Sequence, residues 1–283
     1  MIARILIALA CAVPAAAQAQ SWAWDDGSVP FVVSPEDIVH RMLRIAEVGP
    51  QDFLIDLGSG DGRIVIGAAR LGARGLGLEI DPQLVELARD HARAAGVAER
   101  ARFERQDIFE SDLGAATVVT MYLLPEVNLK LMPKLLALKP GTRIVSHDWD
   151  MGEWPPDETL ELRTPEKSVG IGGRSKIYLW VVPGDARGTW RSELPGYGAW
   201  EFRIAQRYQE LEVSVSAQGR ELVMRGARLR GAQLRLVATG AVVGRAAHHL
   251  FEGTLDDGRI VGEVTISDGE SSRTLPWTAI RSR

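Results

Sequence analysis

The chain has 283 residues, of which 46% are hydrophobic and 25% charged, with one Cys and a formal net charge of -4. This composition excludes a disordered, collagen-like or disulfide-stapled protein, and the length predicts one large or two ordinary domains. The mild acidity gives no electrostatic reason to expect nucleic acid as a partner, so we expect a protein or small-molecule substrate.

The amino end has the pattern of a secretory signal. Arg4 supplies a positive charge, residues 5–17 are apolar, and Ala17-Gln18-Ala19 has the small-x-small form that precedes cleavage. The apolar run is shorter than the ~20 residues that a membrane-spanning helix needs. We therefore predict a signal peptide over residues 1–20, an exported, periplasmic protein and no stable membrane span after the signal is removed. The sole Cys, Cys11, would leave with the signal, so the mature chain would have no thiol chemistry.

The rest of the chain divides by its hydrophobic period. Within residues 21–183, short runs rich in Val, Ile and Leu alternate with helical patterns, which predicts an α/β domain on a largely parallel sheet. Residues 187–283 instead show short alternating stretches separated by turn pairs such as Gln218-Gly219 and Asp257-Gly258. This part is expected to form a small antiparallel all-β domain, either a barrel or a sandwich, with Pro183-Gly184-Asp185 as the linker.

A glycine-rich turn follows the first predicted strand of the α/β domain. The run is Phe53-Leu54-Ile55-Asp56-Leu57-Gly58-Ser59-Gly60-Asp61-Gly62-Arg63, and a helical pattern begins at its end. Its backbone amides can face a ligand where Cβ atoms would clash. A dinucleotide site needs its third Gly three residues after the second, which is not the spacing here. Because Asp56 would repel an anion, we expect a ligand with a cationic amino acid moiety.

Acids also end the next two predicted strands. Glu79 ends the strand that begins at Gly75 and is placed to accept hydrogen bonds from ribose hydroxyls. Asp81 is expected to cap the following helix, which has Pro82 at its first position. A third strand over Ala101–Arg105 leads to Asp107, whose carboxylate could accept a hydrogen bond from an adenine amino group.

Together these residues resemble the seven-stranded class I S-adenosylmethionine-dependent methyltransferases. The resemblance implies a Rossmann-like sheet with helices on both faces and S-adenosylmethionine as cofactor. It implies contacts to the cofactor from seven residues: Asp56, Gly58, Ser59, Gly60, Asp61, Glu79 and Asp107. The glycine run, the upstream Pro30–Pro35 and the later Trp154-Pro155-Pro156-Asp157 are similar to the protein-lysine methyltransferases that modify the adenine nucleotide translocase and the ATP synthase c-subunit. That narrower likeness covers about Pro30 to Val182, has Phe31 where the subgroup usually has Tyr, and leaves the β domain outside.

The methyl acceptor should lie just past the carboxyl ends of the strands. Tyr122 ends a strand predicted from Ala116 and is a candidate to position the acceptor, with a buried tyrosine packing on the sheet as the alternative. Asp148 follows a strand predicted over Thr142–Ser146. It or His147 would line the acceptor site, or serve a supporting or capping role. Adjacent residues on a strand point to opposite faces, so we predict no metal site here.

Three further expectations concern structure. Ser34 and Glu36 resemble a helix cap, and Ser34 has a second claim as part of a segment folding over the cofactor. Pro133 should kink or restart the helix predicted over 126–138. The pair His248-His249 is expected on a strand or loop surface.

Three functions remain open from the sequence. The first is methylation of a nitrogen, most simply a protein lysine, and the second is methylation of a small molecule. The third is a non-catalytic exported protein that binds S-adenosylmethionine and uses the β domain to recognise a partner. Export favours the third, because S-adenosylmethionine is made in the cytosol and would have to be supplied outside it.

Overall fold

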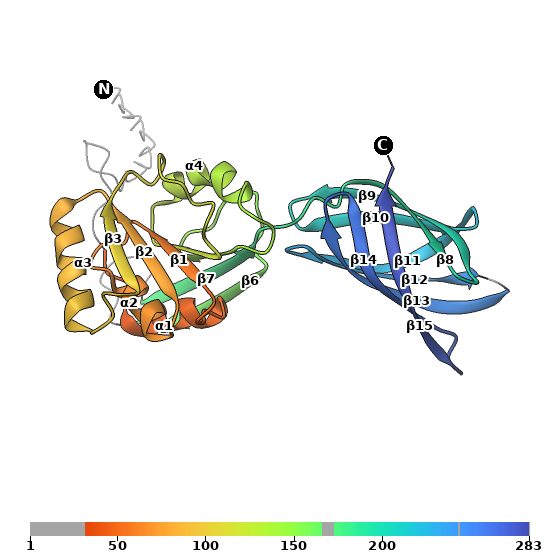
Figure 1. Cartoon of the computed structure of the whole chain (residues 1–283), viewed down its shortest axis with the longest axis horizontal. Coiled ribbons are helices and arrows are strands. Elements are labelled where there is room, and N and C mark those ends of the chain that lie inside the picture. Colours follow the sequence, from red (N-terminus) through yellow and green to blue (C-terminus); the bar gives the residue numbers. More distant parts are fainter. Residues whose placement is uncertain (1–31, 166–172, 243, 283) are drawn as a thin grey trace, which may run out of the picture. The chain divides into compact units, whose positions relative to one another are not determined.

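A computed structural model describes residues 32–165, 173–242 and 244–282, so the predicted signal peptide lies outside the described residues. The first part of the described chain is a sheet flanked by helices (Figure 1). Its strands are β1 (Phe53–Leu57), β2 (Arg74–Glu79), β3 (Ala101–Arg105), β4 (Val118–Met121), β5 (Arg143–His147), β6 (Glu158–Arg163) and β7 (Arg174–Val181). Its helices are α1 (Glu36–Ile45), α2 (Arg63–Arg70), α3 (Pro82–Ala94) and α4 (Pro125–Leu136).

The seven strands lie in the order β3-β2-β1-β4-β5-β7-β6. Strands β1 to β5 pair in parallel, whereas β7 runs antiparallel to both β5 and β6. Apolar residues of α1, α2 and α3 pack together on one face, and those of α4 pack on the other. The predicted Rossmann-like sheet with helices on both faces is therefore confirmed.

Burial on both faces explains the nearly continuous apolar strands. All four residues of β4 are buried, and in β1 Leu54 packs toward α1–α3 while Ile55 and Leu57 pack toward α4. The strand order reverses between β1 and β4. In such sheets ligands bind beyond the carboxyl ends of the strands at this switch point. The glycine-rich turn follows β1 and Tyr122 follows β4, so both leave the sheet there.

The second part of the described chain is an eight-stranded antiparallel barrel (Figure 1). Its strands are β8 (Gly188–Leu194), β9 (Gly198–Arg207), β10 (Glu210–Ala217), β11 (Arg220–Arg230), β12 (Gln233–Val242), β13 (Arg245–Asp256), β14 (Arg259–Ser267) and β15 (Ser272–Arg281). Each strand pairs with its neighbour in sequence, and β15 closes the ring by pairing with β8. The prediction of an antiparallel β domain is confirmed, and of its two forms the barrel is the one observed.

Aromatic side chains fill the barrel interior. Trp200 and Phe202 on β9 contact Phe251 on β13, with ring centroids 5.2 and 5.0 Å apart, and Trp277 on β15 lies 5.0 Å from Phe251. His249 shares the inward face with Phe251 because residues two apart on a strand point the same way. It is fully buried, 5.0 Å from the Trp200 ring, so the expectation of a surface position is wrong for His249.

The helices bear on two further predictions, the effect of Pro133 and the absence of a membrane span. Helix α4 runs without a break from Pro125 to Leu136 with Pro133 inside it, so of the two predicted effects of Pro133 the restart is wrong and the kink stays a prediction. Among the described residues, no helix combines the length and the apolar character required to cross a bilayer.

The barrel wall makes a testable prediction at Gly262. A Cβ there would press against the carbonyl oxygen of Glu252 and lie 2.5 Å from the Cα of Gly253, and backbone atoms cannot move aside. We expect Gly262→Ala to lower the free energy of unfolding by about 1–3 kcal/mol, the usual cost of overpacking, as measured by urea denaturation. Gly226→Ala is the matched control, because nothing lies within 4 Å of its added Cβ. Equal stability of the two variants would contradict the close approach.

Candidate active site

The glycine-rich turn has a backbone that other residues rarely adopt. Gly58, Gly60 and Gly62 have φ values of 72°, 50° and 83°. The amides of Gly58 and Ser59 both donate to the carbonyl oxygen of Leu78, at 2.9 and 3.0 Å, which ties the turn to β2. A Cβ on Gly58 would lie 2.9 Å from Leu123, in the turn after β4. The glycine-rich turn therefore lies against the turn after β4, at the switch point of the sheet.

Asp56 is a buried carboxyl group beneath this turn. Thr120 faces it from β4 in register and donates its hydroxyl to Asp56 at 2.7 Å. Burial raises the pKa of Asp56 to about 7, with smaller contributions from the charges of Glu79 and Asp61, against the lowering effect of the Thr120 hydrogen bond. A carboxyl group with such a pKa gains its charge most readily when a cation lies beside it.

Glu79 holds the other side of the glycine-rich turn. Its carboxylate accepts hydrogen bonds from the amides of Gly60 at 2.9 Å, Ile80 at 2.8 Å and Asp81 at 3.1 Å. Asp81 in turn caps α3 as predicted, by accepting from the amide of Gln83 at 2.7 Å. The end of β2 is thus a fixed acidic corner next to the turn.

The remaining predicted cofactor residues differ in their surroundings. The hydroxyl oxygen of Ser59 is buried and has no hydrogen-bond partner among the described residues. Asp61 forms an ion pair with Arg63, which holds the pKa of that carboxyl below its usual range despite the opposing effect of burial. Asp107 is exposed just beyond β3 and accepts from the amide of Phe109 at 2.8 Å.

These observations fit S-adenosylmethionine. The left-handed glycines let the turn pack closely against its neighbours, the buried Ser59 hydroxyl requires a partner, and the acids suit a cationic nucleoside. Asp56, Gly58 and Gly60 would hold the methionine part, Glu79 the ribose and Asp107 the adenine, and these individual contacts stay predictions. Asp61 already has a strong partner in Arg63, which suits support of the turn better than direct binding.

Tyr122 and Asp148, the two residues predicted to position the acceptor, lie together beyond β4 and β5. The Tyr122 hydroxyl donates to Asp148 Oδ2 at 3.2 Å, and the other carboxylate oxygen accepts from the amide of Lys176 at 3.1 Å. Asp148 has φ 65°, an uncommon value for a residue other than glycine. Burial and the neighbouring carboxylate raise the pKa of the Tyr122 phenol, so it stays protonated at neutral pH.

His147 lies next to Tyr122 and is fully buried. Its ring is 4.0 Å from the Tyr122 ring, and its nitrogens form hydrogen bonds with Ser34 Oγ at 2.9 Å and Ser175 Oγ at 3.0 Å. The helix-cap prediction for Ser34 is therefore wrong, since Pro35 occupies the cap position of α1 and no side chain caps it. The carbonyl of Ser34 also accepts from Arg63 at 2.8 Å, which ties this segment to the start of α2.

Asn128 on α4 is a buried polar residue that the sequence analysis missed. Its side-chain nitrogen donates to Ser146 Oγ and to the carbonyls of Trp149 and Asp150, at 3.1 to 3.2 Å. It thereby holds the start of the segment that follows β5. A polar residue on the apolar face of a helical pattern is the signal that could have identified it.

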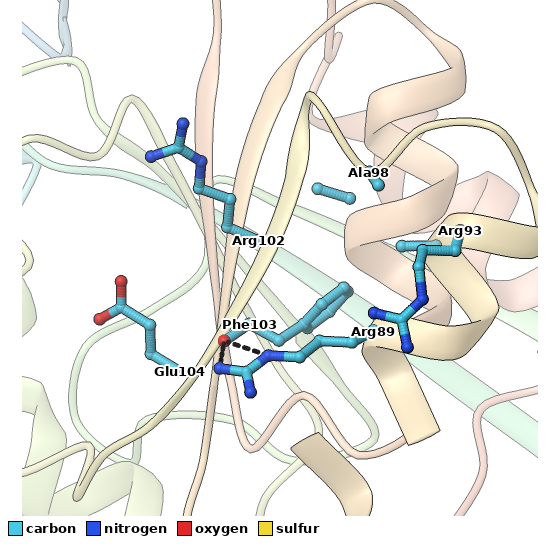
Figure 2. A pocket seen from close by; sticks show the side chains of 8 residues that line it. Arg89, Arg93, Ala98, Arg102, Phe103 and Glu104 are labelled. Atoms are coloured by element: carbon cyan, nitrogen blue, oxygen red, sulfur yellow. Dashed lines mark hydrogen bonds between the residues drawn. The ribbon is translucent and has the colours of Figure 1, made fainter. Parts of the chain in front are cut away.

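A separate pocket of about 340 Å³ lies between α3 and β3 (Figure 2). Arg89 extends from α3 and donates to the carbonyl oxygen of Phe103 with two guanidinium nitrogens, at 3.2 and 2.7 Å. Strand β3 is an edge of the sheet, and covering an edge carbonyl discourages pairing with another chain. None of the predicted site residues lines this pocket, so we interpret it as part of the protected edge.

Comparison with known proteins agrees with this site. A family model described as the ANTKMT methyltransferase domain matches residues 56–158. A protein-lysine N-methyltransferase of Saccharolobus islandicus is 41% identical over 157 residues, which are 54% of this chain and 94% of that protein. The adenine nucleotide translocase lysine N-methyltransferase of Mus musculus is 38% identical over 130 residues, 45% of this chain and 56% of that protein. The chain thus spans about half the length of the mouse relative.

Among solved structures, an RNA methyltransferase from Salinibacter ruber bound to S-adenosyl-L-homocysteine is 52% identical. The match covers 54% of this chain and 95% of that one, with a TM-score of 0.49.

The sheet, the glycine-rich turn and these relatives define a class I methyltransferase whose cofactor is S-adenosylmethionine. Within that class, the chain belongs to the family of protein-lysine N-methyltransferases that includes the archaeal relative.

The pKa of Asp56 predicts opposite pH trends for two measurements. Below pH 7 the carboxyl group is protonated and loses its attraction for the cationic cofactor, so calorimetry should find S-adenosylmethionine bound several-fold more weakly at pH 6 than at pH 8. The free protein should become less stable as pH rises from about 4 to 7, because its raised pKa makes the folded state bind the extra proton.

Asp56→Asn should reduce both trends, and Asp112→Asn, at an exposed carboxylate, should leave them unchanged. A wild-type affinity that does not vary with pH would contradict a role for Asp56 in cofactor binding.

Proposed function

We propose that this enzyme transfers methyl groups from S-adenosylmethionine to lysine side chains of a protein. The main support is the 41% identity to an archaeal protein-lysine N-methyltransferase over 94% of that protein's length. The acidic and phenolic groups beyond β4 and β5 add chemical support, since they suit an amine better than an anionic acceptor.

The reaction is an in-line displacement. S-adenosylmethionine, when bound, supplies an electrophilic methyl carbon attached to a sulfonium. The lysine nitrogen lone pair forms the new N–C bond as the C–S bond breaks, and the bonding electrons leave with sulfur. The protein must align three atoms and deliver a neutral amine, because free lysine has a pKa of ~10.4.

Tyr122 and Asp148 would share this work. The Asp148 carboxylate attracts the incoming ammonium, and the lone pairs of the Tyr122 oxygen accept from its N–H groups. Because the pKa of the Tyr122 phenol is raised, Tyr122 acts as a hydrogen-bonding group and not as the base. The lysine proton would leave to solvent or through Asp148 before methyl transfer.

Labelled methyl transfer tests the proposed function. Incubating the purified enzyme with labelled S-adenosylmethionine and an envelope extract should place label in protein that yields methyl-lysine on acid hydrolysis. Label in RNA or in small metabolites would overturn the lysine proposal. Binding of S-adenosylmethionine with no transfer to any fraction would favour a non-catalytic role.

Substitutions test the acceptor side separately. We expect Tyr122→Phe and Asp148→Asn to lower kcat about 10- to 100-fold, the usual scale for lost positioning, with little change in cofactor affinity measured by calorimetry. Asp112→Asn is a control at an exposed carboxylate that accepts from a nearby amide. Wild-type turnover in both acceptor-side variants would remove these residues from the mechanism.

We also propose that residues 1–20 direct export of the enzyme to the periplasm. The support is the positive residue, apolar run and Ala17-Gln18-Ala19 motif of the amino end. Cell fractionation should recover the enzyme from the periplasm, with an amino terminus near Ser21. Recovery of the unprocessed chain from the cytosol would contradict export.

A further inference from the structure

The turn between β9 and β10 of the barrel contacts the segment that follows β5. Residues 32–283 form one compact unit, and Tyr208 packs with the apolar residues on the α4 face of the sheet. The Tyr208 ring stacks on the indole of Trp154, with centroids 6.1 Å apart and an interplanar angle of 18°. Gln209 accepts from Trp154 Nε1 at 3.0 Å and donates to the carbonyl of Pro155 at 2.5 Å. The Gln209 side-chain amide therefore both accepts and donates a hydrogen bond, and both partners lie on the short segment Trp154-Pro155.

Trp154 is the far anchor of the loop that carries Asp148. It is fully buried, its carbonyl accepts from the Trp180 indole at 2.9 Å, and it forms an isolated bridge with Met151. At the near end, Asn128 holds the carbonyls of Trp149 and Asp150. The loop from Asp148 to Pro155 is thus fixed at both ends, once by α4 and once by the barrel.

This loop needs external support. A non-glycine residue in the left-handed region, as Asp148 is, is strained and persists only where its surroundings hold it. Asp148 is also tied to β7, because its own amide donates to the carbonyl of Lys176 at 2.7 Å. The two loop anchors hold the chain that continues from this point. Losing either anchor should therefore loosen residues 149–154 and let the Asp148 carboxylate shift relative to the Tyr122 hydroxyl.

The residues at the tip of the β9–β10 turn suit the contact with Trp154 better than they suit the turn itself. Arg207 and Glu210 pair across it, so Tyr208 and Gln209 are its two central residues, and Tyr208 has φ 56°. Because φ is positive at Tyr208 and not at Gln209, this turn favours glycine at its first central residue. The β9–β10 turn accepts strain at a bulky tyrosine, whose ring meets Trp154.

We propose that Tyr208 and Gln209 are positioning residues for methyl transfer, which makes the barrel a structural part of the acceptor side. The inference rests on the proposed function, in which Asp148 orients the amine. The barrel contacts Trp154 and so restrains the loop that begins at Asp148.

A double variant separates this role from barrel folding. Tyr208→Gly with Gln209→Ser places glycine at the position of positive φ, which favours the turn, and removes both contacts to Trp154. We expect unchanged or higher barrel stability, cofactor affinity within about 2-fold of wild type, and at least 10-fold lower kcat in labelled methyl transfer. Hydrogen exchange of the amides in residues 149–154 should accelerate.

Two further variants serve as controls. Tyr208→Phe keeps the ring stacked on Trp154 and should retain turnover. Gln218→Asn changes the β10–β11 turn, where the side chain bonds only within the barrel to the Tyr197 carbonyl, and should also retain turnover.

Unchanged turnover and unchanged exchange in the double variant would overturn the inference, as would equal losses at Gln218. Exchange is measured without an acceptor, so it tests the anchoring even if label enters RNA or a small molecule. Faster exchange together with label outside lysine would support the anchoring and overturn only the proposed function.

Discussion

The left-handed glycine turn between β1 and α2 is the constraint on which the site depends. Its conformation lets the amides of Gly58 and Ser59 reach the Leu78 carbonyl and brings the Gly60 amide to Glu79. A Cβ on Gly62 would lie 2.6 Å from the Phe103 ring, so the start of α2 can pack there only without a side chain. The same backbone therefore fixes the acidic residue Glu79 beside the turn and the position of helix α2.

Strand β4 connects the predicted cofactor site to the proposed acceptor site. Thr120 donates to the buried Asp56 beneath the glycine-rich turn, and Tyr122, two residues later, donates to Asp148. Because Thr120 and Tyr122 are only two residues apart, backbone geometry sets the spacing between the predicted cofactor site and the proposed acceptor site. Asp148 accepts from the amide of Lys176 on β7, and the loop that follows it is held by Asn128 on α4 and by Gln209 of the barrel through Trp154.

Local patterns predicted the parts of this arrangement that depend on neighbouring residues. The bounds of β3 and the cap at Asp81 follow from alternation and from helix-start chemistry, and both are observed. Contacts between residues that are far apart in the chain leave no comparable pattern in the sequence. Ser34 looked like a cap because Glu36 follows it, yet its hydroxyl is bonded to His147, which lies 113 positions away. His249 looked like a surface residue because its inward face depends on barrel register, and alternation alone does not distinguish a barrel from a sandwich.

The closed meander of the barrel brings its first and last strands together, with Ile280 of β15 opposite Arg191 of β8. A fold whose two ends are adjacent can be joined to another protein through a single short connection without disturbing its own hydrogen bonds. The barrel is joined to the sheet by one short segment, Pro183-Gly184-Asp185, and the pairing of β15 with β8 keeps its ring of strands closed.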